Sequence, residues 1–243
     1  MDNKANNLQN YAEMLGITLN EKQLHQFETY KNMVIEKNKV MNLTAITDSQ
    51  EFDLKHFADS LSLVNAVAQA KALTAQSTVI DVGTGAGFPG IPLKIAFPGI
   101  KLTLLDSLNK RIRFLDEVIN ELGLEDVTTI HARAEEGARK SELRDSFDFV
   151  VSRAVANQST LTEYCLPYAK TGGYFIAYKS GDIEEELKSA AKAIKTLGGK
   201  LEDTIAFDLV DSDIKRSFVV IRKTKNTPGA YPRKAPAASK TPL

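Results

Sequence analysis

The chain contains the segment Val79-Ile80-Asp81-Val82-Gly83-Thr84-Gly85-Ala86-Gly87-Phe88, in which a hydrophobic run passes directly into three alternating glycines. The run predicts a strand, and the residues after it predict a helix. Glycine tolerates positive φ and lets the backbone come close to a ligand, and the helix directs its N-terminal amides at the same place. The segment therefore predicts a ligand site at a strand–turn–helix junction.

The residues around the glycines indicate which ligand this junction binds. The segment departs from the dinucleotide pattern GxGxxG, because Phe88 stands at the third glycine position and Asp81 lies inside the strand. A pyrophosphate needs free amide donors, whereas a carboxylate near the turn suits a ligand with a positive centre. S-adenosylmethionine is such a ligand, with a sulfonium, an ammonium group and no phosphate. The segment favours a methyltransferase, and a nicotinamide-dependent dehydrogenase is the alternative.

Asp106 ends the next predicted strand, 19 residues after Gly87. A carboxylate at this place can accept hydrogen bonds from both hydroxyls of a ribose. An Asp that closely precedes a helix, here the one predicted from Asn109, can equally be an N-terminal cap. Asp106 is therefore a candidate cofactor ligand with an open structural alternative.

Short β-branched runs alternate with amphipathic helices from Thr78 onward, which predicts a mainly parallel sheet covered on both faces. The predicted strands are Thr78–Val82, Lys101–Asp106, Val127–His131, Phe147–Ser152 and Tyr174–Tyr178, and the predicted helices are Pro89–Ala96, Asn109–Leu122, Glu135–Lys140, Gln158–Tyr168 and Ile183–Leu197. Two further strands, Lys200–Leu209 and Arg216–Lys223, have no helix between them and should form an antiparallel hairpin at one sheet edge. This pattern predicts an α/β, doubly wound, Rossmann-like fold of the class I methyltransferase kind.

The N-terminal part reads as a helical cap on this sheet. Asn20 with Gln23 resembles a capping box, and Asp48 with Glu51 repeats the signal before a helix expected to run through Val67. We therefore divide the chain into a helical cap (1–70), a methyltransferase domain (71–224) and a basic, Pro-rich tail (225–243).

Composition excludes several classes of function. The chain has 243 residues, 43% of them hydrophobic, with 31 basic and 31 acidic residues. It has no apolar stretch of 18 residues, and its first residues, MDNKANNLQN, have no apolar core, so we expect neither a spanning helix nor a signal peptide. The three histidines are scattered and, with a single cysteine, give no metal-ligand spacing. The single cysteine cannot form an internal disulfide, which fits a reducing cytoplasm. We expect a cytoplasmic monomer without a metal.

The charge is unevenly distributed along the chain. Residues 214–243 carry eight basic and no acidic residues, a sequence signal for an anionic partner. Four prolines crowd the last 16 residues, so a solvated tail is an equally good interpretation.

The sequence resembles the RsmG (GidB) family, bacterial methyltransferases that modify guanine N7 in small-subunit ribosomal RNA. The matching segments are Asn42-Leu43-Thr44, His56-Phe57-Ala58-Asp59-Ser60, Asp81 to Gly90 with its extension through Leu93, Arg133-Ala134-Glu135, Ser152-Arg153-Ala154-Val155-Ala156 and Tyr231-Pro232-Arg233-Lys234. The chain departs from the family at Pro236-Ala237-Ala238 and at Lys179-Ser180-Gly181.

The resemblance implies S-adenosylmethionine as cofactor and 16S rRNA of the small ribosomal subunit as partner, with the guanine at position 527 in the 530 loop as target. It also implies which residues contact the cofactor, with Arg153 bounding the site on the substrate side. The cofactor-binding candidates are Asp81, Gly83, Gly85, Gly87, Phe88, Asp106, Ser107, Leu108, Ala134, Glu135 and Arg153.

The absence of two known methyltransferase motifs argues against two kinds of methylation reaction. Cytosine C5 methylation needs a cysteine nucleophile, but Cys165 lies inside a predicted helix, and the Asn/Asp-Pro-Pro-aromatic segment of amine methyltransferases is replaced by Ser152-Arg153-Ala154. Guanine N7 carries a lone pair and no proton, so its methylation needs alignment of the reactants and no general base. We therefore name no catalytic acid or base and expect Arg153 and Lys179 to position the reactants.

The RNA must present an unpaired base to such a site. Candidates for phosphate or base contacts are Arg153, Lys179, Arg222, Arg233 and Lys234, with Tyr231 stacking on a base or packing on the body of the protein. Two alternatives remain open: a methyltransferase of another substrate and a non-catalytic RNA-binding assembly factor. The intact glycine segment argues against the second.

Overall fold

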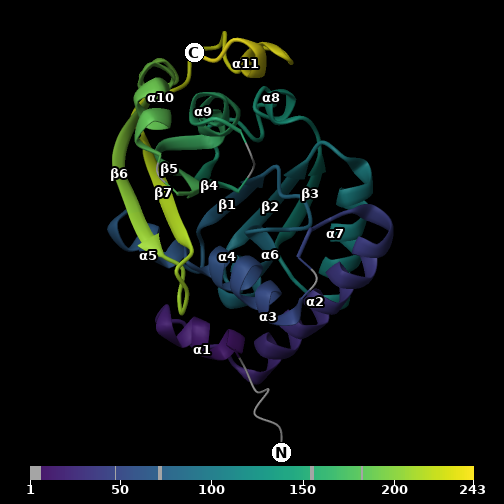
Figure 1. The fold of residues 1–243 in the computed structure, drawn as a ribbon. Helices are drawn as coiled ribbons and strands as arrows, with labels where there is room; N and C mark the ends of the chain where they lie inside the picture. Colours follow the sequence, from purple (N-terminus) through teal and green to yellow (C-terminus); the bar gives the residue numbers. More distant parts are fainter. Residues whose placement is uncertain (1–6, 47, 71–72, 154–155, 182) are drawn as a thin grey trace, which may run out of the picture.

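The computed structural model describes residues 7–46, 48–70, 73–153, 156–181 and 183–243. Their core is a seven-stranded sheet in the order β3-β2-β1-β4-β5-β7-β6, with helices on both faces (Figure 1). The strands are β1 (Thr78–Val82), β2 (Lys101–Asp106), β3 (Val127–His131), β4 (Phe147–Ser152), β5 (Ala169–Ser180), β6 (Gly199–Asp208) and β7 (Lys215–Lys223).

The predicted doubly wound sheet is confirmed. The first four strands have the predicted bounds, and β1 pairs in parallel with β2 on one side and with β4 on the other. The strand order therefore reverses next to β1, where ligands of open α/β sheets bind, outside the carboxyl ends of the strands. The predicted hairpin is also confirmed: β7 pairs antiparallel with β5, and β6 pairs with β7 at the outer edge.

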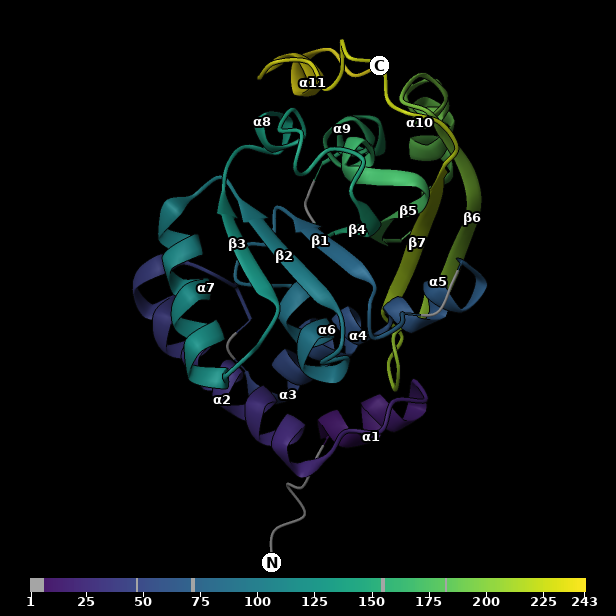
Figure 2. The same ribbon diagram turned by 180° about the vertical axis from the view of Figure 1, so that it is seen from behind.

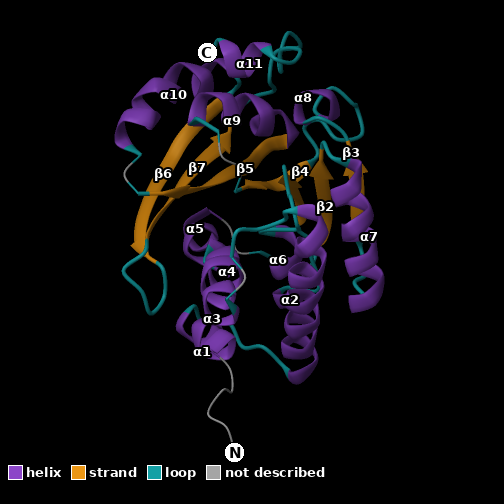
Figure 3. Ribbon diagram, turned by 45° about the vertical axis from the view of Figure 1, so that its right-hand side comes forward, coloured by secondary structure: helices purple, strands orange, loops and turns teal. Residues whose placement is uncertain are grey.

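In the inner strands, side chains alternate between two cores, one on each face of the sheet. In β1 and β4, Val79 and Phe149 belong to the first core, and Ile80 and Val150 belong to the second. Figure 3 shows α1–α7 below the sheet and α8–α11 above it. The helices that follow β1 are α6 (Gly90–Ala96), α7 (Asn109–Leu122), α8 (Ala134–Gly137), α9 (Gln158–Cys165), the 3-10 turn η2 (Leu166–Tyr168), α10 (Glu184–Thr196) and α11 (Ala237–Lys240).

The N-terminal helices cover the first face. They are α1 (Asn7–Met14), α2 (Glu21–Met41), α3 (Ser49–Phe52), α4 (Asp59–Leu61) and α5 (Leu63–Ala70). The Asn20–Gln23 capping box is present at the start of α2, and Glu51 N donates to Asp48 Oδ1 at 3.0 Å. Their apolar side chains share the first core with the sheet, and the division of the chain at residues 70 and 224 stays a prediction.

The helix predicted to run unbroken from Asp48 through Val67 is interrupted. Residues Asp53–Ala58 form a π-helix, η1, between α3 and α4. A π turn holds one residue more than an α turn, and here it brings His56, Phe57 and Ala58 together to the buried side. The interruption places His56 beside Phe88 of the glycine segment.

The C-terminal segment packs on the second face, where it runs across α8 and α9 (Figure 2). Arg144 donates to the carbonyl oxygens of Thr227 and Tyr231 at 2.7 and 3.0 Å. Arg233 forms a two-oxygen ion pair with Glu163 of α9, whose side chain is fully buried. The segment is therefore attached to the protein body in this conformation.

Candidate active site

The glycine segment forms the turn between β1 and α6. Gly83, Gly85 and Gly87 have φ values of 75°, 63° and 108°, which side-chain-bearing residues rarely adopt. A Cβ atom at Gly87 would lie 2.7 Å from the hydroxyl of Tyr30, whereas one at Gly85 would meet no atom within 4 Å. Gly87 thus serves internal packing, and Gly85 faces open space.

Asp81, near the end of β1, stabilises this turn through hydrogen bonds. Its Oδ2 accepts hydrogen bonds from the Thr84 hydroxyl at 2.7 Å and from the Gly90 amide at 2.9 Å. Its Oδ1 is buried and has no hydrogen-bond partner among the described residues. Burial raises the pKa of Asp81 to about 6, against the hydrogen bonds from Thr84 and Gly90, which lower it. An unpaired carboxylate oxygen under the turn favours a ligand that carries positive charge there.

Asp106 accepts hydrogen bonds through both of its carboxylate oxygens, and its predicted contact with a ribose stays a prediction. Its Oδ1 accepts from the Leu108 amide at 2.8 Å, which caps the turn before α7. Its Oδ2 accepts from the Gly85 amide at 2.9 Å and from Arg111 at 3.2 Å. Asp106 therefore ties the end of β2 to the glycine turn, at the carboxyl edge where a ribose would bind.

A cavity of about 310 Å³ opens at the carboxyl ends of β1, β2 and β3. Its walls contain five of the predicted cofactor ligands, Gly83, Asp106, Ser107, Ala134 and Glu135. Leu108 is 42% exposed and does not line it, and Phe88 points instead toward His56 and Arg153. The structure thus brings about half of the predicted cofactor ligands around one cavity, with Asp81, Gly85 and Gly87 in the turn beside it.

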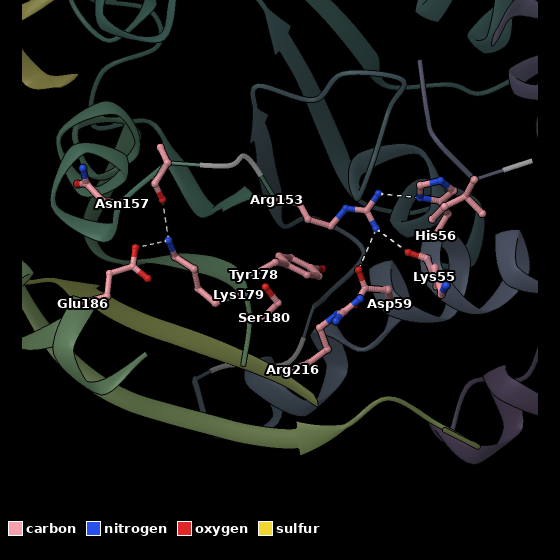
Figure 4. A pocket seen from close by; sticks show the side chains of 12 residues that line it. Lys55, His56, Asp59, Arg153, Asn157, Tyr178, Lys179, Ser180, Glu186 and Arg216 are labelled. Atoms are coloured by element: carbon pink, nitrogen blue, oxygen red, sulfur yellow. Dashed lines mark hydrogen bonds and ion pairs between the residues drawn. The ribbon is translucent and has the colours of Figure 1, made fainter. Parts of the chain in front are cut away.

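A second cavity, of about 620 Å³, lies beyond β4 and β5. Figure 4 shows its side chains in two groups, with Arg153, His56, Asp59 and Arg216 at one end and Lys179, Glu186 and Asn157 at the other. Both predicted positioning residues, Arg153 and Lys179, line it. The Ser152 hydroxyl donates to the Val82 carbonyl at 2.7 Å, so the strand ends that border the two cavities are in contact.

Arg153 is fixed by contacts to three residues of the N-terminal helices. It donates to the Lys55 carbonyl at 3.2 Å, to Asp59 Oδ2 at 2.9 Å and to His56 Nδ1 at 3.1 Å. Asp59 Oδ1 accepts from Arg216 of β7 at 2.7 Å. One buried carboxylate therefore anchors two guanidinium groups in the wall of the cavity.

His56 is neutral in this network. Burial and the charge of Arg153 lower the pKa of His56 to about 3. Because Nδ1 accepts from Arg153, Nε2 carries the proton and donates to the Thr44 hydroxyl at 2.7 Å. The segments Asn42-Leu43-Thr44 and His56 to Ser60 thus meet through the Thr44–His56 hydrogen bond, and the second of them contacts Arg153.

The remaining predicted RNA contacts lie elsewhere. Arg222 pairs with Tyr174, six residues along β7 from the Arg216–Ser180 pair and about 20 Å from it at the usual rise of a strand. Arg233 is held by Glu163, the ring of Tyr231 packs on the second core, and Lys234 is exposed. Ala154 and Val155 lie outside the described residues. RNA binding by these tail residues stays a prediction.

Sequence reasoning missed Asp59, Tyr178, Glu186 and Arg216 as cavity residues. Asp59 and Arg216 come from segments 157 residues apart that only the fold brings together. Asp59 had a signal, since it belongs to the quoted His56-Phe57-Ala58-Asp59-Ser60 segment, whereas Glu186 looks like an ordinary first-turn acid of a helix.

Comparison with known sequences identifies the family. Residues 23–218 match the family model GidB, described as rRNA small subunit methyltransferase G. The chain belongs to this family. It is 54% identical to the ribosomal RNA small subunit methyltransferase G of Lachnoclostridium phytofermentans, over 94% of this chain and 93% of that protein. It is 50% identical to the protein of the same name from Alkaliphilus metalliredigens, over 97% of both chains.

Solved structures support the fold. The chain superimposes on M. jannaschii TYW2 in complex with AdoMet with a TM-score of 0.51 and 18% identity, over 65% of this chain and 74% of that one. It superimposes on TrmN from Thermus thermophilus with a TM-score of 0.52 and 15% identity, over 70% and 53% of the two chains. The predicted Rossmann-like methyltransferase fold is confirmed.

Two further findings concern the described part of the chain alone. None of its helices is long and apolar enough to cross a membrane. It also contains no group of three or more His, Cys, Asp or Glu side chains placed to hold a metal ion.

Proposed function

We propose that this chain, a methyltransferase by its family, transfers a methyl group from S-adenosylmethionine to N7 of a guanine in 16S rRNA. The resemblance stated above gives the guanine at position 527 as the target. The observation that carries the proposal is that Arg153 lines the larger cavity and directly follows Ser152, which is hydrogen-bonded to Val82 in the wall of the smaller cavity. The smaller cavity fits a nucleoside cofactor, and the larger one fits an incoming base.

The residues around the smaller cavity fit S-adenosylmethionine. When bound, this cofactor supplies a methyl group activated by a sulfonium. Asp106 and Ser107 would hold its ribose and Ala134 and Glu135 its adenine, and the open face of Gly85 leaves room for the rest of the molecule. The unpaired Oδ1 of Asp81 gives the turn the negative charge that a sulfonium and an ammonium favour.

The larger cavity suits a reaction that needs no proton acceptor. Both ring nitrogens of His56 are engaged, and its lowered pKa shows that it is a poor base. Burial raises the pKa of the Cys165 thiol far above its usual range, so it is no nucleophile. Guanine N7 attacks with its own lone pair, and what the chain supplies is alignment of the reacting atoms.

The charge of the larger cavity favours an RNA target. Lys55, Arg153, Lys179 and Arg216 line it, against the two carboxylates of Asp59 and Glu186. A positively charged cavity raises the local concentration of a polyanion and orients its backbone. We further propose that the chain acts in the cytoplasm, where ribosomal subunits are found, and as a monomer, because both cavities are built from one chain.

The proposal is tested by mapping N7-methylguanine in small-subunit RNA from cells with and without this gene. Loss of one methylated guanine on deletion, restored by the wild-type gene, is the expected result. An unchanged map would leave the two alternatives, a methyltransferase of another substrate or a non-catalytic assembly factor. Binding of S-adenosylhomocysteine would then support the first of them.

A further inference from the structure

The end of the larger cavity away from Arg153 carries an ion pair between β5 and α10. Lys179 Nζ donates to Glu186 Oε1 at 2.6 Å and to the Ala156 carbonyl at 2.8 Å. Glu186 Oε2 makes no hydrogen bond or ion pair with any residue that the structure describes, and the carboxylate stands at the cavity wall (Figure 4). The pair thus presents a cationic donor beside a carboxylate oxygen that is still available.

The other carboxylate of the cavity has no such oxygen. Asp59 Oδ2 accepts from Arg153 and Asp59 Oδ1 accepts from Arg216, and the residue is buried. Among the described residues that line the cavity, Glu186 is therefore the carboxylate that can accept a hydrogen bond from an incoming base.

The donor of Lys179 and the acceptor of Glu186 stand in the order that is complementary to guanine and not to adenine. Guanine presents its O6 acceptor next to the N1–H donor and the N2 amine, whereas adenine presents the N6 amine next to the N1 acceptor. A lysine ammonium beside a free carboxylate pairs with O6 and N1–H of guanine. Against adenine the same pair would set donor against donor and acceptor against acceptor, at a cost for each unmatched group.

We propose that the Lys179–Glu186 pair recognises the O6–N1 edge of the target guanine and so selects guanine over adenine. This inference rests on the proposed function. It places N7 on the part of the base that Glu186 does not contact, with its lone pair available for attack. Methylation puts positive charge on the purine and makes N1–H a stronger donor, so the bond to Glu186 strengthens as the reaction proceeds.

The ion pair also has a structural interpretation, since it joins β5 to the first turn of α10. The two roles differ in what they predict for a base whose donor and acceptor at positions 6 and 1 are reversed. Adenine has an N7 as guanine does, but it presents a donor at N6 and an acceptor at N1. A structural role slows both bases equally, whereas recognition changes their ratio.

The test compares the wild type with Glu186→Gln and the neighbouring Glu185→Gln, whose side chain is 90% exposed. Each enzyme methylates reconstituted small subunits that carry guanine or adenine at the target, and kcat/KM is measured. We expect a guanine preference of about tenfold or more in the wild type and in Glu185→Gln, the size of a hydrogen bond to a charged group. We expect the preference to fall to about twofold in Glu186→Gln.

A preference that is the same in Glu186→Gln and in the wild type would overturn the assignment and leave the pair a structural one. A wild type that does not prefer guanine would overturn it as well. If the wild type forms no N7-methylguanine on the guanine-containing subunits, the proposed function itself fails, and this outcome is visible before any variant is compared.

Discussion

The guanidinium of Arg153 lies over the ring of Phe88, with its central carbon 5.0 Å from the ring centroid. His56 stacks on the same ring at 4.5 Å, almost parallel to it. The last residue of the glycine segment and the first residue after β4 are thus in direct contact. A residue of the proposed cofactor turn therefore helps to hold Arg153, which lines the cavity proposed to receive the target base.

Arg153→Lys should reduce catalysis much more than cofactor binding. Lysine cannot reproduce the planar fork that contacts Asp59, His56 and the Phe88 ring together. We expect kcat/KM on small subunits to fall about 100-fold or more, because alignment supplies much of the rate. Affinity for S-adenosylhomocysteine, measured by calorimetry, should stay within about threefold, since Arg153 lines the other cavity. Arg113→Lys on the exposed side of α7 is the control. An equal fall in kcat/KM in Arg153→Lys and Arg113→Lys would contradict the account.

Gly85→Ala should weaken cofactor binding beyond its effect on stability. Gly85 has φ +63°, so alanine costs about 1–2 kcal/mol of folding free energy through backbone strain. Gly123 at the end of α7 has φ +59° and equally open surroundings, so Gly123→Ala is a matched control for that strain. We expect similar losses of stability and a loss of S-adenosylhomocysteine affinity in Gly85→Ala alone. Unchanged affinity for S-adenosylhomocysteine in Gly85→Ala would contradict a role of the glycine turn in cofactor binding.

His56 should make the protein less stable in acid. Its pKa is about 3 when folded, below the ordinary value of 6.5, so the unfolded chain binds its proton more readily. Stability from this group is therefore complete above pH 6.5 and is lost as the pH falls toward 3, by about 2 kcal/mol at pH 5. The wild type should lose that much more than His56→Gln between pH 7 and pH 5 in urea unfolding. Asp81 titrates in the opposite sense but is present in both proteins, and identical pH profiles would contradict the assigned network.

Arg233→Ala should destabilise the protein. Removing the arginine leaves the fully buried Glu163 carboxylate without its counter-charge, at a cost of about 3 kcal/mol. The double variant Glu163→Gln, Arg233→Ala should recover part of this loss, because the buried charge is gone. If Arg233→Ala instead unfolds at the wild-type urea concentration and only weakens binding to small subunits, the arginine is an RNA contact as its sequence segment suggested.

Local patterns in the sequence specified much of the sheet. The first four strands and α7 could be placed to the residue, because short buried strands and an amphipathic helix have different periods. Strand β5 was predicted as Tyr174–Tyr178, because Gly172 and Gly173 weaken the strand pattern just before it. In the structure the strand runs from Ala169 to Ser180. Ala169, before the glycines, pairs with Phe147 of β4, and Lys179 and Ser180 at the other end pair with β7; such pairing is not visible in local composition.

The second cavity was harder to predict, because its residues depend on long-range packing. The π turn at Asp53–Ala58 has no sequence signature, yet it turns His56 toward Phe88. The basic tail was interpreted from its charge, but the acidic partner of Arg233 is buried in α9, 70 residues earlier. The glycine segment could be recognised because its residues are neighbours in the chain and form a single turn.

The most direct test of the central claim is transfer of a labelled methyl group by the purified chain. The protein is incubated with S-adenosyl[methyl-³H]methionine and small subunits from a strain that lacks this gene, and the modified nucleoside is identified by mass spectrometry. The account predicts close to one labelled methyl group per subunit, recovered as N7-methylguanosine. Label recovered in any other nucleoside, or no label above that of a sample without enzyme, would contradict it.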